Sequence, residues 1–315
     1  MKIIIPGGTG QVGTLLARAF HGDGHEVVVL SRRQHVAPWR VDLWDGRTQG
    51  AWSDQLNGAD VVINLAGQSV NCRYTPSNRM RIFASRMFST YAVGTAITHC
   101  AVPPAVWLQA STATIYAHRY DAPNTECHHM MGGTEPHLPD TWRFSVAVAH
   151  AWEQMVDRFI LPTTRSIKLR SAITMSPDPG SAFDVLLGLV RHGLGGQQGN
   201  GRQFVSWIHD QDFVQAMYWL IDHPDLAGAI NLSAPHPLPN AAFMRILRLA
   251  WGTHIGLPAM EWMLDIGARV LHTETELVLK SRRVIPTRLV ESGFQFVFPT
   301  WHTAAQDLCH RWRAR

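Results

Sequence analysis

The chain has 315 residues with an ordinary globular composition, 46% hydrophobic and 17% charged, and its net charge of +4 comes without a run of five or more basic residues. This pattern does not predict a nucleic-acid-binding protein, and no apolar stretch reaches the roughly 18 residues of a membrane-spanning helix. The four scattered cysteines form neither a disulfide framework nor a metal-binding pair, and no basic leader precedes the first apolar residues. We therefore expect a cytoplasmic protein with free thiols, either a monomer or a homodimer.

Strand-length apolar runs alternate with segments of helical period through about the first 170 residues. The predicted strands are Lys2–Pro6, Val27–Leu30, Asp60–Leu65, Ala105–Ala110 and Ser166–Arg170. The predicted helices are Gly13–Gly22, Pro76–Cys100 and Phe144–Phe159. Alternation of this kind is typical of a parallel sheet covered by helices. The sequence therefore predicts an α/β protein with a doubly wound parallel Rossmann sheet.

The rhythm of strands and helices changes after about residue 175, where Pro, Gly and Asp cluster. Helical segments follow at residues 212–222, 240–251 and 259–272, with a short strand at 229–232. We predict a Rossmann domain over residues 1–172 and a smaller, mainly helical substrate-side subdomain over 173–315, with residues from about 203 to 232 as candidates to join the Rossmann core. Ligands of such sheets bind beyond the carboxyl ends of the strands, so the second part is expected to close over that edge.

A glycine-rich loop follows the first predicted strand and runs directly into a helix. Its residues are Gly7-Gly8-Thr9-Gly10-Gln11-Val12-Gly13. Gly7 permits a sharp turn, Gly10 lets the backbone approach a pyrophosphate, and Gly13 lets the helix pack close to the sheet. The helix N-terminus then offers free N–H groups to phosphates. This context predicts dinucleotide binding, with a purely structural glycine turn as the alternative.

The end of the second strand indicates which nicotinamide cofactor is preferred. A carboxylate there would bind the ribose hydroxyl of NAD(H), whereas arginine accommodates the 2′-phosphate of NADP(H). The residues are Ser31 and Arg32, with no carboxylate. We therefore predict NADP(H) rather than NAD(H), held by Ser31 and Arg32, with a solvated arginine as the alternative. Asp42 and Leu43, after a third strand, are expected beside the adenine.

Several segments together resemble the extended short-chain dehydrogenase/reductase superfamily. They are the glycine loop, Asn64-Leu65-Ala66-Gly67 at the end of the fourth strand, and Ser111–Tyr116 at the end of the next. Residues 199–210 and 283–289 resemble one atypical branch, the epimerase-like proteins with a small C-terminal domain of unknown function. The resemblance covers nearly the whole chain. It implies contacts to NADP(H) from the glycine loop, Ser31, Arg32, Asn64, Leu65 and Arg86, the last through a phosphate oxygen.

The catalytic residues of this superfamily are only partly present. Its enzymes transfer a proton through a Tyr whose pKa is lowered by a Lys four residues later, while a Ser or Thr hydroxyl binds the substrate oxygen. Thr112 preserves that hydroxyl. Phe144 and Val148 stand where the Tyr and Lys belong, and neither can carry a proton. Inherited catalysis is therefore in doubt.

Another proton donor is needed if chemistry persists. Tyr116 is our candidate catalytic residue beside Thr112, and His118, Tyr120 and Ser145 are further candidates. For each of them a structural role is the alternative, because Tyr and His commonly sit half-buried with a satisfied polar tip.

Three other patterns do not favour a ligand site. The run Cys127–Met131 contains metal-binding side chains, but adjacent residues cannot easily converge on one ion, so we predict no metal. Trp207 and His209 are candidates to line a substrate pocket, with simple packing as the alternative. Trp262, Ile266 and Val270 form a stripe at four-residue spacing that predicts core packing or a subunit contact.

These expectations leave two functional hypotheses. The leading hypothesis is an NADP(H)-dependent oxidoreductase or epimerase-like enzyme acting on a small polar substrate near Thr112. The second is a non-catalytic protein that binds NADP(H) to sense redox state or to order a surface. The loss of the Tyr and Lys couple favours the second hypothesis.

Overall fold

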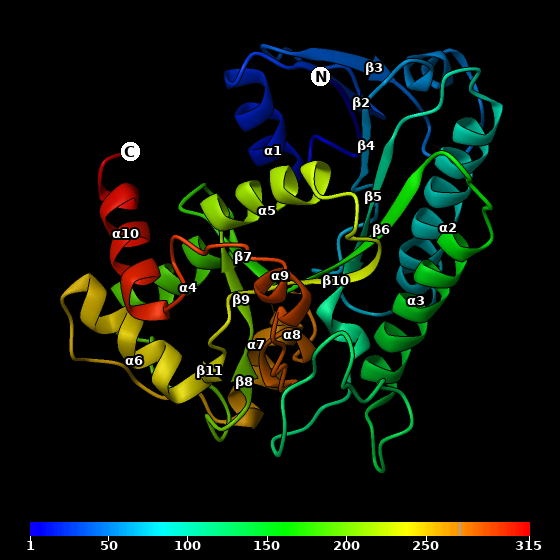
Figure 1. The fold of residues 1–315 in the computed structure, drawn as a ribbon. Coiled ribbons are helices and arrows are strands. Elements are labelled where there is room, and N and C mark those ends of the chain that lie inside the picture. Colours follow the sequence, from blue (N-terminus) through cyan, green and yellow to red (C-terminus); the bar gives the residue numbers. More distant parts are fainter. Residues whose placement is uncertain (271) are drawn as a thin grey trace.

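The computed structural model describes residues 1–270 and 272–315, apart from the side chain of Val270. Its centre is a seven-stranded sheet in the order β10-β6-β5-β4-β1-β2-β3 (Figure 1). All neighbouring strands in it are parallel. The strands are β1 Lys2–Pro6, β2 Glu26–Ser31, β3 Arg40–Leu43, β4 Val61–Asn64, β5 Val106–Thr112, β6 Arg165–Ser171 and β10 Gly228–Leu232. The predicted doubly wound Rossmann sheet is confirmed.

Helices cover both faces of the sheet (Figure 1). Helices α1 (Gln11–Gly22) and α5 (Asp210–Asp222) lie on one face, and α2 (Pro76–His99) and α3 (Asp140–Asp157) lie on the other. Successive side chains of a strand point to opposite faces. Accordingly, Ile3 and Ile5 pack in the core under α1 and α5, whereas Ile4 packs in the core under α2. Burial on both faces explains why these strands read as continuous apolar runs.

Several predicted boundaries differ from the structure by a few residues, and two of them lie near the candidate site. Helix α3 begins at Asp140 rather than Phe144, because Pro139 precedes the helix in an extended conformation and Asp140 occupies its first turn, where a carboxylate is favoured. Asp42 and Leu43 do not follow the third strand but close it, because they pair with Leu30 and Ser31 of β2.

The C-terminal region is mainly helical and has its own apolar core. Helices α4 (Ala182–Arg191), α6 (Asn240–Trp251) and α10 (Trp301–Arg313) contribute to that core, which contains Phe243 and Trp301. The remaining elements of this region are β7 Ile173–Met175, β8 Phe204–Val205, β9 Trp207–His209, β11 Leu238–Pro239, α7 Glu261–Val270, α8 Glu276–Leu279 and α9 Thr287–Glu291. Strand β7 pairs with β9 and β8 with β11, while α5 and β10 return to the large sheet.

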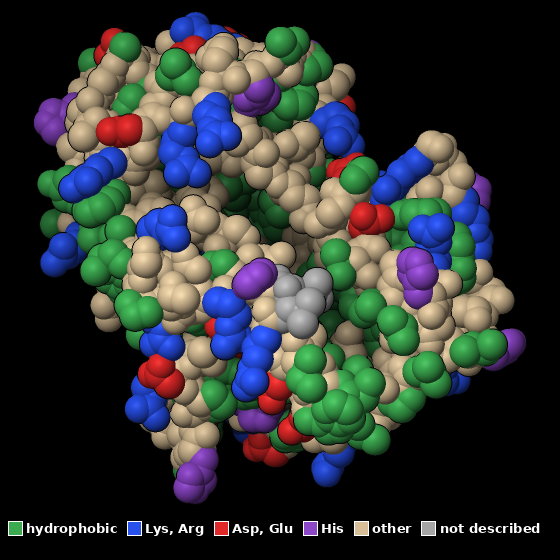
Figure 2. Space-filling view, turned by 180° about the vertical axis from the view of Figure 1, so that it is seen from behind, with side chains coloured by type: hydrophobic (Ala, Val, Ile, Leu, Met, Phe, Trp, Pro, Cys, Tyr) green, Lys and Arg blue, Asp and Glu red, His purple; other side chains and the backbone are tan. Residues whose placement is uncertain are grey.

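Helix α7 presents apolar side chains to solvent. Trp262 is 64% exposed and Ile266 is 53% exposed, so the expectation that they pack in the core is wrong. The side chain of Val270 lies outside the described residues, and a subunit contact stays a prediction. Figure 2 shows hydrophobic side chains gathered beside a hollow on the back of the molecule. Within residues 1–270 and 272–315, no helix is both long and apolar enough to span a membrane.

Candidate functional site

The glycine loop packs closely against the backbone at Gly7 and Gly13. Gly7 has a φ of +75°, and a Cβ there would lie 2.6 Å from the Cα of Ala66. A Cβ on Gly13 would lie 2.5 Å from the Cα of Gly8. At Gly10, by contrast, the nearest atom to such a Cβ would be 3.7 Å away. The loop is therefore closed on its inner side and open at Gly10, where a ligand could approach the backbone.

The N-terminus of α1 suits a phosphate group. Gly10 is the N-cap and no side chain caps the helix, whose first turn contains no acidic residue. Thr9, Gly10 and Gln11 are exposed, and Val12 is half-buried. The free N–H groups and the positive end of the helix dipole thus remain available to a pyrophosphate. The residues present fit a dinucleotide, and the individual contacts predicted for Gly7 to Gly13 stay predictions.

The end of β2 offers a free cation and no free carboxylate. The Oγ of Ser31 accepts a hydrogen bond from the Arg33 N–H at 3.2 Å. Arg32 is exposed and makes no ion pair with any described residue. The Asp42 carboxylate is engaged at 2.8 Å by Arg40. A 2′-phosphate at this position would face the Arg32 guanidinium, whose charge is not neutralised by any described carboxylate.

The turn after β4 is fixed by hydrogen bonds of Asn64. This buried side chain donates to the Oε1 of Gln109 at 2.9 Å, and its Oδ1 accepts from the Ala66 N–H at 3.1 Å. The Leu65 N–H donates to the carbonyl of Pro6. Residues Asn64 to Gly67 therefore form a fixed turn beside the glycine loop, at the end of the fourth strand of the chain.

Arg86 lies behind this wall. Its Nη1 donates to the carbonyl oxygens of Gln68 at 3.1 Å and Ile82 at 3.0 Å, and the guanidinium stacks over Trp152 at 4.8 Å. Burial lowers the pKa of Arg86 to about 10. The arginine braces the loop that contains Gly67, and its predicted reach to a phosphate stays a prediction.

A cavity of about 210 Å³ lies at the carboxyl end of β5. It is lined by Val70, Tyr74, Ile82, Arg86, Ser111, Thr112, Thr114, Phe144, Ser145, Val148, Ala149, Trp152, Glu276, Leu277 and Arg282. Thr112 lines this cavity, as expected for a hydroxyl that binds a substrate oxygen, and its Oγ1 also accepts from the Thr114 N–H at 3.1 Å. Phe144 and Val148 face the same space, so the two positions of the missing couple present only hydrocarbon to it.

Tyr116 does not line the cavity. Its side chain is 2% exposed, and its hydroxyl donates to the Oδ1 of Asn231 at 2.7 Å and accepts from Arg170 at 2.9 Å. Arg170 in turn pairs with Glu153 at 2.8 Å. The predicted proton donor is therefore turned toward β6 and β10, where it belongs to a buried network. His118 accepts from the Ser281 N–H and Tyr120 is exposed, and neither lines the cavity.

The candidate Ser145 lines the cavity, together with Tyr74, Glu276 and Arg282, which the sequence did not point to. Ser145 Oγ lies 3.4 Å from the hydroxyl of Tyr74 and 2.5 Å from the Oε2 of Glu276. Arg282 lies beside them. The only signal in the sequence was a charged segment, Thr273 to Arg282, that contains one of the chain's three lysines.

Comparison with known proteins identifies the family of this chain. Residues 3–233 match the profile of the NAD dependent epimerase/dehydratase family, and residues 261–308 match a domain of unknown function, DUF1731. The chain belongs to the NAD dependent epimerase/dehydratase family. The expected resemblance to the epimerase-like branch with a C-terminal domain of unknown function is thereby confirmed.

Relatives of this epimerase family cover the chain almost completely. An epimerase family protein of Staphylococcus saprophyticus is 30% identical over 308 residues, which cover 98% of this chain and 99% of that protein. One of Staphylococcus aureus is 28% identical over 309 residues, 98% of each chain. The structure of the human epimerase family protein SDR39U1 (isoform 2) with NADPH has a TM-score of 0.85, at 26% identity over 98% of this chain and 99% of that chain.

Two motifs have structural roles in this epimerase family member. Trp207 is fully buried against Trp301, with ring centroids 5.0 Å apart. His209 is also fully buried, stacks on Phe298, and its Nε2 lies 3.0 Å from the Oδ2 of Asp307. Packing, the alternative reading of this pair, is what the structure shows. Among the residues described, no group of three or more His, Cys, Asp or Glu could hold a metal ion.

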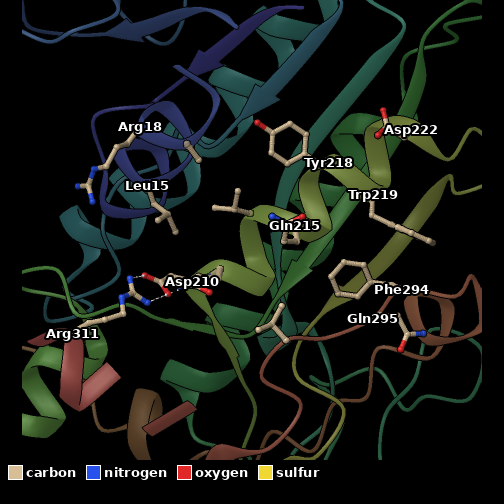
Figure 3. A pocket seen from close by; sticks show the side chains of 14 residues that line it. Leu15, Arg18, Asp210, Gln215, Tyr218, Trp219, Asp222, Phe294, Gln295 and Arg311 are labelled. Carbon is tan, nitrogen blue, oxygen red and sulfur yellow. Dashed lines mark hydrogen bonds and ion pairs between the residues drawn. The ribbon is translucent and has the colours of Figure 1, made fainter. Parts of the chain in front are cut away.

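This chain has a second, larger hollow, lined by residues of α1 and α5. This groove has a volume of about 690 Å³ and shares no lining residue with the cavity at Thr112. Figure 3 shows Tyr218, Trp219 and Phe294 along it, with Arg311 paired to Asp210 at one end. The groove is the larger hollow, but the Thr112 cavity lies at the sheet edge where the glycine loop also ends, which is where ligands of such sheets bind.

Proposed function

We propose that the chain is an NADP(H)-dependent oxidoreductase or epimerase-like enzyme that acts on a small polar molecule. One observation carries this proposal: the glycine loop after β1, the Ser31-Arg32 pair after β2 and the Thr112 cavity after β5 all lie at the carboxyl edge of one parallel sheet. That edge is where dinucleotides bind in such folds. When bound, the cofactor would supply a hydride donor or acceptor.

Each part of the edge has a proposed partner on the cofactor or the substrate. The N–H groups of the first turn of α1 bind the pyrophosphate, and Ser31 and Arg32 bind the 2′-phosphate. The small residues Ala66 and Gly67 leave room for the cofactor to pass. Thr112 donates a hydrogen bond to the substrate oxygen. The human relative with NADPH, which is similar over the whole chain, supports the choice of NADP(H).

Titration of the purified protein with NADPH and with NADH, followed by nicotinamide fluorescence, tests the proposal. We expect NADPH to bind at least tenfold more tightly than NADH, a difference of about 1.4 kcal/mol. If neither nucleotide binds, the proposal is wrong and the scaffold serves another ligand. Equal affinities would retain the fold assignment but remove the role given to Arg32.

The apolar faces of Phe144 and Val148 favour a second candidate function, a non-catalytic NADP(H)-binding sensor. Both candidates predict cofactor binding. Only the enzyme predicts turnover, which can be sought by following NADPH absorbance with a panel of small aldehydes, ketones and nucleotide sugars. Turnover that disappears in Thr112→Val would support the enzyme, whereas tight NADPH binding without turnover across the panel would support the sensor.

A further inference from the structure

The C-terminal domain delivers a carboxyl group to the place where helix α3 lacks a proton carrier. Phe144 and Val148 of α3 line the cavity and cannot exchange protons. Glu276, at the start of α8, lines the same cavity and is only 2% exposed. It lies within the domain of unknown function, residues 261–308.

Contacts on both sides anchor the segment that contains Glu276. On one side, the Glu274 carboxylate pairs with Arg73 at 3.0 Å and accepts from the Tyr74 N–H at 2.7 Å. On the other side, Lys280 donates to the carbonyl of Thr114 at 2.7 Å, and the Nε of Arg282 donates to the Thr114 Oγ1 at 3.2 Å. The segment is thus fastened to the loop before α2 and to the turn just after Thr112. Glu276 is held between these anchors.

One oxygen of Glu276 accepts a hydrogen bond, whereas the other makes only two long ion pairs. Oε2 lies 2.5 Å from the Ser145 hydroxyl. Oε1 is buried and makes no hydrogen bond with any described residue, and its ion pairs with Arg282 and Lys280 are long, at 3.9 and 4.0 Å. Buried carboxyl oxygens are rarely left without a partner. A substrate hydroxyl or carbonyl in the cavity would satisfy it.

We propose that Glu276 is the acid and base of this protein, exchanging a proton with the substrate oxygen that Thr112 binds. Ser145 is a positioning residue that holds the carboxyl group in place. The proposal rests on the proposed function, since it assumes that hydride transfer takes place at this cavity. It assigns a role to the C-terminal domain, which replaces the proton carrier that α3 has lost.

The proton balance of the proposed step is simple. In reduction of a ketone or aldehyde, the hydride adds to the carbonyl carbon and the C=O π bond breaks. The carboxyl O–H of Glu276 then breaks and its proton goes to the oxygen, which leaves an alcohol and a carboxylate. Oxidation of an alcohol runs in reverse, with the carboxylate taking the hydroxyl proton. The carboxylate regains its proton from solvent between turnovers.

The surroundings of Glu276 suit a group that changes its protonation state. Burial raises the pKa of Glu276, and the charge of Glu274 raises it further. Arg282, Lys280 and the hydrogen bond from Ser145 act in the opposite direction. The Tyr74 hydroxyl on the facing loop is neutral, because burial raises its pKa to about 12. Burial therefore favours the protonated form of Glu276, and a new positive charge in the cavity would favour release of its proton.

Proton release on cofactor binding tests the proposal without a known substrate. The nicotinamide ring is positively charged in NADP⁺ and neutral in NADPH, while the phosphates are the same. NADP⁺ should therefore lower the pKa of Glu276 and release up to about one proton per site, and NADPH should not. The measurement uses a pH indicator in weakly buffered solution, from pH 5.5 to 8, as the difference between the two titrations.

Variants identify the group that releases the proton. Glu276→Gln should abolish the difference in proton release while the affinity for NADPH is kept. The matched control is Glu126→Gln, at a half-buried carboxyl whose pKa is also raised by burial but which does not line the cavity, and this variant should keep the difference. Ser145→Ala should move the release to higher pH, because it removes a hydrogen bond that stabilises the carboxylate, and this shift tests the proposal even if Glu276→Gln does not fold.

The outcomes separate the two proposals. Failure of NADP⁺ and NADPH to bind overturns the proposed function and this inference with it. Binding without any difference in proton release, or with the same difference in Glu276→Gln as in the wild type, overturns the role of Glu276 and leaves the proposed function standing.

Discussion

The glycine loop and the Thr112 cavity lie along one sheet edge, but the chain builds them differently. The loop consists of seven consecutive residues, Gly7 to Gly13, whose spacing alone dictates a turn and a helix start. The cavity gathers Tyr74, Thr112, Ser145 and Glu276 from four separate segments. A local site can be recognised in a sequence, whereas an assembled site depends on how distant elements pack. The cofactor end is consequently the more predictable half of this protein.

The largest expected effect is on stability and comes from the buried ion pair between Glu153 and Arg170. Glu153 and Arg170 form a buried pair at 2.8 Å, with side-chain exposures of 8% and 6%. Glu153→Gln leaves the Arg170 charge uncompensated, so we expect the free energy of unfolding to fall by about 3 kcal/mol at pH 7 in denaturant titrations. Asp157→Asn, one turn later on α3 in an exposed pair with Lys168, should cost less than about 1 kcal/mol. Equal losses would contradict the buried pair's importance.

The same pair predicts a pH dependence. The Arg170 guanidinium and the Ser111 hydroxyl lower the pKa of Glu153 in the folded state, against the effect of burial. Its stabilising contribution is therefore present above the unfolded pKa and is lost as the pH falls through the folded one. The difference in stability between the wild type and Glu153→Gln should be constant above about pH 5 and shrink in acid. A difference that grows in acid would contradict this sign.

The next effect tests the loop. Gly7→Ala places a Cβ 2.6 Å from backbone at a φ of +75°, so the turn must shift. We expect NADPH affinity to fall at least 100-fold, about 2.7 kcal/mol, in fluorescence titrations. Gly22→Ala is the control, because a Cβ there meets nothing within 4 Å and alanine favours helix. If Gly7→Ala binds normally, the loop does not form the pyrophosphate site.

A smaller effect separates the two nicotinamide cofactors. Arg32→Ala should weaken NADPH binding about tenfold, which is about 1.4 kcal/mol, and leave NADH binding unchanged, since only NADPH carries the 2′-phosphate. Arg33→Ala, the exposed neighbour, is the control and should change neither affinity by more than about twofold. A parallel loss of both cofactors in Arg32→Ala would show that the arginine contributes general charge rather than specificity.

The sheet and its helices could be predicted because their signals are local. Ile3 to Ile5 and Val27 to Leu30 are buried on both faces of the sheet, so each strand reads as a continuous apolar run. The glycine loop follows the first of these runs. The start of α3 at Asp140 is harder to predict, because Pro139 and Asp140 mark it only weakly in the sequence.

The cavity could be predicted only in part. Thr112 ends a strand, so its place at the sheet edge follows from the strand itself. Glu276 and Arg282 reach the cavity through packing of a segment more than 150 residues further along the chain. Nothing in their spacing relates them to Thr112. Tyr116 shows the converse, because a residue four positions after Thr112 in sequence turns away from it into another network.

The variant Tyr116→Phe decides whether Tyr116 takes part in the chemistry or only stabilises the fold. Tyr116→Phe removes the donor to Asn231 and the acceptor for Arg170 in a buried network, so we expect a loss of about 1 to 2 kcal/mol in unfolding free energy. Because the hydroxyl does not face the cavity, NADPH affinity should stay within about twofold of the wild type. Tyr120→Phe, at an exposed ring, should change stability by less than about 0.5 kcal/mol. If Tyr116→Phe instead left stability intact and abolished turnover of a substrate found in the panel, the tyrosine would be the proton donor, and Glu276 would have only a structural role.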